Sequence, residues 1–105
     1  EAPDTRDPYI ECARLAYRLS DWPLCFFMTG EALKIKEKSK TFVNMGYAWD
    51  HTPYDLGAIA CYRLGLLKRS LELAKKALEF APNDERLKNN VRLIKNKLDE
   101  SREKH

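Results

Sequence analysis

The fold is decided by the stretch Thr52-Pro-Tyr-Asp-Leu-Gly-Ala-Ile-Ala-Cys-Tyr-Arg-Leu-Gly65, which reads as one helix and the turn that ends it. Thr52 can cap this helix, and Pro53 occupies the first helical position, where its missing N–H costs nothing. Asp55 follows the cap by three residues, as in a capping box. Gly65 ends the helix, because glycine adopts the left-handed conformation most easily.

Two further helices are predicted downstream. The first spans residues 67–80, and its apolar stripe is formed by Leu67, Leu71, Ala74 and Leu78. Pro82-Asn83-Asp84 ends that helix and caps the next one. The last helix runs from Glu85 to about Glu100, with an apolar face formed by Leu87, Val91, Ile94 and Leu98.

A weaker copy of the helix pair predicted at residues 52–80 lies 45 positions upstream. The identities in register are Pro8 with Pro53, Tyr9 with Tyr54, Ala13 with Ala58, Tyr17-Arg18-Leu19 with Tyr62-Arg63-Leu64, and Ala32-Leu33 with Ala77-Leu78. Small residues such as Cys12 and Gly57 also coincide, and small side chains let helices pack closely. Asp7 can cap the first helix of this copy, which runs to about Leu19, and Trp22-Pro23 opens its second. The chain therefore contains an internal repeat.

The second copy resembles the tetratricopeptide repeat (TPR), a helix pair of about 34 residues. The matching positions are Tyr54, Gly57-Ala58, Cys61, Ser70, Ala74, Ala77 and the closing Pro82. This resemblance implies an all-α fold, an α-α superhelix of two TPR-like helix pairs plus a C-terminal capping helix, about five helices in all. We expect a linker or domain boundary at residues 1–7, repeat one at 8–37, an aromatic insertion at 38–51, repeat two at 52–84 and the capping helix at 85–101.

Composition limits the function classes. The chain is 44% apolar, which suffices for one small core, and its net charge of +3 is too mild to indicate nucleic acid or membrane as a partner. No stretch approaches the roughly 20 apolar residues of a membrane span. Cys12, Cys25 and Cys61 show no paired spacing, so we expect small buried thiols and a reducing, cytoplasmic setting. The polar start of the chain suggests a domain excised from a larger protein.

The insertion contains aromatic residues, which makes it too apolar for a plain linker. One interpretation is that they cover an exposed edge of the helix pairs. The alternative is a binding surface formed by Tyr47, Trp49 and His51.

The TPR resemblance also implies a binding groove, because the first helix of each pair lines the concave face. Carried over by position, its lining is Ile10, Arg14, Tyr17, Arg18, Asp55, Ile59, Tyr62, Arg63, Asn89, Leu93, Asn96 and Lys97. The repeated Tyr-Arg dipeptide suits an acidic or phosphorylated partner, since arginine binds carboxylate and phosphate with paired hydrogen bonds. The alternative is that each tyrosine packs between helices and each arginine pairs with a nearby carboxylate.

The sequence contains no convincing catalytic constellation. Asp50, His51 and Asp55 are the best candidates for a small metal-dependent enzyme, but a metal site needs three or four ligands with defined geometry. We therefore expect a non-catalytic domain without cofactor or metal, which binds a protein or peptide. Two repeats are fewer than the three or so that a stable array usually needs, so a homodimer is an alternative to capping by the last helix.

A second resemblance concerns the parent protein. Trp22-Pro-Leu-Cys25, Tyr47-Ala-Trp49 and Pro53-Tyr-Asp-Leu56 look like the helical repeat region of some bacterial and phage-type glycosyltransferases. This resemblance implies an accessory interaction domain of such an enzyme, with the sugar-nucleotide chemistry upstream. The alternative is a free-standing TPR adaptor.

Overall fold

The computed structural model describes residues 6–35 and 50–103, and within each of these two parts short turns join the helices. In chain order the helices are α1 (Asp7–Arg18), α2 (Trp22–Lys34), α3 (Thr52–Arg63), α4 (Leu67–Phe80) and α5 (Glu85–Glu103). The described part of the chain contains no strand, so the predicted all-α fold is confirmed. No described helix is both long and apolar enough to cross a bilayer.

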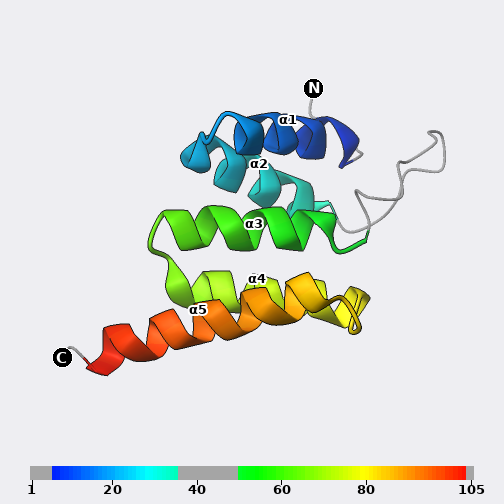
Figure 1. The fold of residues 1–105 in the computed structure, drawn as a ribbon. Helices are drawn as coiled ribbons and strands as arrows, with labels where there is room; N and C mark the ends of the chain where they lie inside the picture. The colour runs from blue at the N-terminus through cyan, green and yellow to red at the C-terminus, as the bar shows by residue number, and fades with distance from the viewer. Residues whose placement is uncertain (1–5, 36–49, 104–105) are drawn as a thin grey trace.

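The helices pack in the order in which they occur, each against the next, and α3 lies in the middle of the stack (Figure 1). One core cluster joins α1, α2 and α3 through Ile10, Ala13, Ala16, Cys25, Ala32, Leu56 and Ala60. The other joins α3, α4 and α5 through Ala58, Cys61, Leu73, Ala74 and Ile94. Because α3 contributes to both clusters, it is buried on two sides and any ligand can reach it only along the strip between them.

The turns after α1 and α3 confirm the internal repeat. Ser20 and Gly65 occupy equivalent positions, and both have a left-handed backbone, with φ of 57° and 82°. In the first turn the amide of Asp21 donates to the carbonyl of Ala16 (2.8 Å), and in the second the amide of Leu66 donates to Cys61 (2.8 Å). The two helix pairs therefore end their first helices with the same capping geometry.

The helix starts differ in part from the prediction. Asp21 and Asp84 cap α2 and α5, since their Oδ1 atoms accept from the amides of Leu24 (3.2 Å) and Leu87 (3.2 Å). The prediction that Thr52 caps α3 is wrong, because Thr52 is the first residue of the helix. Its amide donates to Asp50 Oδ1 (2.9 Å). Likewise Asp7 is the first residue of α1 rather than its cap. Both α1 and α3 therefore begin one residue earlier than predicted, and proline is the second residue of each helix.

Small residues permit the close packing at α3. A Cβ atom on Gly57 would lie 2.9 Å from Thr29 Cγ2 and 3.0 Å from Leu73 Cδ1, so α2, α3 and α4 meet there. At Gly30 a Cβ atom would meet nothing within 4 Å, so no close contact requires a glycine at that position. Cys25 and Cys61 are buried free thiols, as predicted, and Cys12 is half-buried.

The apolar stripe predicted for α4 is turned slightly from the true one. Its buried residues are Ser70, Leu73, Ala74 and Ala77, whereas Leu67, Leu71 and Leu78 are only half-buried. Ser70 can be buried because its hydroxyl donates to the carbonyl of Ala58 (2.7 Å). The polar residue at the centre of this face is therefore a link to α3, which a count of apolar residues misses.

Candidate functional site

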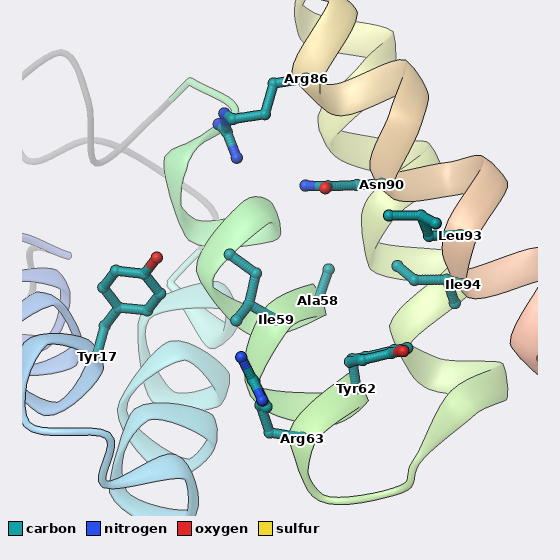
Figure 2. Close-up of a pocket in the computed structure, with 9 residues that line it drawn as sticks. All are labelled: Tyr17, Ala58, Ile59, Tyr62, Arg63, Arg86, Asn90, Leu93 and Ile94. Carbon is teal, nitrogen blue, oxygen red and sulfur yellow. The ribbon is translucent and has the colours of Figure 1, made fainter.

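A cavity of about 360 Å³ lies between the exposed strip of α3 and the first half of α5 (Figure 2). Its lining is Tyr17, Ala58, Ile59, Tyr62, Arg63, Arg86, Asn90, Leu93 and Ile94. A second hollow of about 410 Å³ is lined by Arg14, Tyr17, Arg18, Thr52, Asp55 and Leu56. Because Tyr17 lines both, we treat the two hollows as one feature, called the groove from here on.

Asp55 fixes the polar groups at one end of the groove. Arg86 donates to both of its carboxylate oxygens, through Nη2 to Oδ2 (2.7 Å) and Nη1 to Oδ1 (3.3 Å), and Asn90 Nδ2 donates to Oδ1 (3.4 Å). The Asp55 side chain is only 14% exposed, whereas that of Arg86 is 54% exposed. This hydrogen bonding raises the pKa of the Arg86 guanidinium above its ordinary value. Asp55 therefore holds one arginine and one amide of α5 in place, and both still face the groove.

The rest of the groove is apolar and aromatic. Ala58 and Ile94 are buried and form its floor, while Leu93 is 60% exposed. Tyr17 and Tyr62 are partly exposed and come from α1 and α3. Figure 2 shows Ile59 of α3 between two arginine side chains. Arg86 reaches from α5 toward the start of α3, and Arg63 belongs to the end of α3. Such a surface offers hydrophobic contact along its length and hydrogen-bonding groups at its ends.

Trp22 supports the far end of the groove. Its ring meets that of Tyr17 edge to face, with centroids 5.7 Å apart, and the Arg63 guanidinium carbon lies 5.5 Å from the Trp22 ring centroid. Cation–π contacts of this geometry orient an arginine without neutralising it. Trp22, the first residue of α2, was not among the predicted site residues.

Most of the predicted lining of α1 and α3 comes together. Arg14, Tyr17, Arg18, Asp55, Ile59, Tyr62 and Arg63 all line the groove. The prediction for Ile10 is wrong, because this side chain is fully buried in the core between α1, α2 and α3.

The α5 side of the groove is less well predicted. Leu93 lines it as expected, but Asn89, Asn96 and Lys97 are exposed and do not. The residues missed there are Arg86, Asn90 and Ile94, which follow one another at four-residue spacing and therefore share one face of α5.

The aromatic insertion contributes little that can be described. Tyr47 and Trp49 lie outside the described residues, whereas His51 is half-buried with Nδ1 3.9 Å from Asp50 Oδ2. Asp50 serves the start of α3, and Asp55 is bound by Arg86 and Asn90. Within residues 6–35 and 50–103, no three His, Cys, Asp or Glu side chains are grouped as metal ligands. Asp50 therefore belongs to the start of α3, and Asp55 to the groove.

Over residues 6–35 and 50–103, five stacked helices with a groove along α3 define the class, a TPR-type helical domain. Residues 6–100 match the family model of the prolyl 4-hydroxylase peptide-substrate-binding domain, and the chain belongs to that family. The match supports a protein or peptide as partner and gives no support to the resemblance to glycosyltransferases. No curated protein and no solved structure matches the chain.

Proposed function

We propose that the groove binds an extended, proline-containing peptide and holds it for a prolyl 4-hydroxylase. The observation that carries this proposal is the pair Arg86 and Asn90, held by Asp55 at the end of an apolar, tyrosine-bearing groove. The family description supports it, because a prolyl 4-hydroxylase acts on proline and its substrate-binding domain binds peptide. The segment itself would perform no chemistry.

The chemistry of the groove suits a polyproline II helix. Such a helix has three residues per turn and no internal hydrogen bonds, so its carbonyl groups are available to a receptor. Two of the five guanidinium N–H groups of Arg86 are used by Asp55, and the others can donate to peptide carbonyls. The pyrrolidine rings would pack on Ile59, Leu93 and the ring of Tyr17 or Tyr62. A preformed helix also loses little entropy on binding.

The proposal replaces the glycosyltransferase with a prolyl 4-hydroxylase as the parent enzyme. A free-standing adaptor with the same groove is the alternative, and the mass of the native polypeptide separates the two. Self-association and a cytoplasmic location stay predictions, and sedimentation at several concentrations tests the first.

Titration calorimetry with a blocked twelve-residue peptide of proline and alanine tests the proposal. A glycine–serine peptide of equal length controls for non-specific binding, since it does not populate the polyproline II helix. We expect Asn90→Ala to weaken binding about fivefold or more, the effect of one or two lost hydrogen bonds. Asn96→Ala is the matched control, because Asn96 is exposed on the same helix but outside the groove. Equal effects of the two substitutions, or equal binding of the two peptides, would contradict the proposal.

A further inference from the structure

We propose that Arg63, which lies over the ring of Trp22, is a subsite for an acidic side chain of the bound peptide. This inference rests on the proposed function and adds a position-specific requirement to it. Arg86 and Asn90 bind the main chain of one peptide residue. The acidic side chain belongs to a residue about four positions away along the peptide.

The first observation concerns the contacts of the Arg63 guanidinium group. Among the described residues, Arg69 and Arg86 each pair with a carboxylate, whereas Arg63 contacts the ring of Trp22. Its side chain is exposed and lines the groove. A guanidinium in a cation–π contact keeps its charge and its N–H groups, which match a carboxylate. Because the contact with Trp22 already restricts the side chain, less entropy is lost when the carboxylate binds.

The second observation is the charge of the groove. Its charged lining includes Arg18, Arg63, Arg86 and one carboxylate, Asp55. Asp55 and Arg86 pair with each other, so their charges offset one another, and Arg18 and Arg63 add positive charge. A peptide in this groove therefore meets a positive surface, and an acidic residue on it gains where a basic residue loses.

The third observation is the distance between the two ends. Asp55, which holds Arg86, and Arg63 are eight positions apart on α3. At 1.5 Å per residue this spans about 12 Å. A polyproline II helix rises about 3.1 Å per residue, so about four of its residues cover the same length. Figure 2 shows Arg86 and Arg63 at these two ends, with Ile59 between them.

A glutamate scan of the twelve-residue peptide tests the inference. Glutamate and, as its neutral control, glutamine replace each alanine in turn, and the Kd ratio of each pair is measured by calorimetry. We expect one position, or two adjacent ones, where glutamate binds about fivefold more tightly, with the gain reduced in 0.5 M salt. Arg63→Gln should remove this preference, so that the glutamate and glutamine peptides of each pair bind with the same Kd. Trp22→Leu should reduce the preference although Arg63 is present, because the guanidinium loses its support.

The outcomes separate this inference from the proposed function. Arg69→Gln is the matched control, since Arg69 is exposed on α4 outside the groove and should leave the preference unchanged. If the neutral peptide does not bind the wild-type domain, the proposed function itself fails. If the neutral peptide binds but no position favours glutamate, or if the preference survives Arg63→Gln, the acidic subsite is overturned.

Discussion

The two TPR-like pairs share a scaffold but use it differently. The Tyr-Arg dipeptides at residues 17–18 of α1 and 62–63 of α3 occupy equivalent positions, and both dipeptides line the groove. The positions of Ile10 and Asp55 are also equivalent, yet Ile10 is fully buried and Asp55 binds Arg86 and Asn90 of α5. The same register thus serves the core in the first pair and the site in the second.

The difference follows from the neighbours of each helix. Asp55 is compatible with the second pair because α5 supplies an arginine and an amide to its carboxylate. The same position in α1 packs among apolar side chains of the first core cluster. An unpaired carboxylate there would lose its hydration without compensation. The repeat therefore specifies geometry, and the next element along the stack decides the chemistry.

Ile10→Asp breaks this comparison most severely. A buried, unpaired charge costs several kcal/mol, so we expect the free energy of unfolding to fall by about 4 kcal/mol or more, enough to unfold a small domain. Ile10→Val should cost only about 1 kcal/mol, which separates the effect of charge from that of volume. Urea denaturation followed by circular dichroism measures both. A cooperative Ile10→Asp variant of nearly native stability would mean that this position is not in the core.

Asp55→Ile makes the reciprocal change. We expect the helical content to persist, because Arg86 remains more than half exposed and can be hydrated. The affinity for the proline–alanine peptide should fall about tenfold, since Arg86 and Asn90 lose the group that positions them. Asp84→Ala is the control, because Asp84 caps the same helix α5 without lining the groove. If Asp84→Ala weakens binding as much as Asp55→Ile does, Asp55 acts only through the stability of α5.

The sequence predicts the scaffold better than the site. Gly65, the Tyr-Arg repeat and the stop at Pro82 depend on local rules, and the structure bears them out. Ile10 was wrongly predicted to line the groove, because the repeat pattern does not show which neighbouring helix packs against a given position. Arg86 and Asn90 were missed because the rotation of α5 is set by packing against α4, which lies outside the repeat pattern.

Two glycines sharpen the comparison at the level of packing. Gly57 replaces Cys12 of the first pair at the point where α2, α3 and α4 meet, and an added Cβ would press on the buried Thr29. We expect Gly57→Ala to destabilise the domain by about 1 kcal/mol despite its better helix propensity. Gly30→Ala, where a Cβ meets nothing, should stabilise it by up to about 1 kcal/mol. Thermal melts measure both, and a stabilising Gly57→Ala would show that the helices can separate there without cost.

The cysteines give the smallest effect, a difference in reactivity between buried and half-buried thiols. Burial raises the pKa of Cys61 to about 11 and also raises that of Cys25, while Cys12 is half-buried. At pH 8 only about one Cys61 thiol in a thousand is then ionised, and the thiolate is the reactive form. We expect maleimide labelling, followed by peptide mass spectrometry, to modify Cys12 first and the other two only on unfolding.

The same shift fixes a pH dependence of stability. The unfolded Cys61 thiol ionises near its ordinary value of 9.0, whereas the folded one keeps its proton to about pH 11. Between these values the folded state binds more protons than the unfolded state, so the contribution of Cys61 to stability falls as the pH rises through this window. Cys61→Ala introduces the alanine of the equivalent position, Ala16. It should flatten the fall in urea midpoint between pH 9 and 11, and an unchanged slope would assign that fall to other groups.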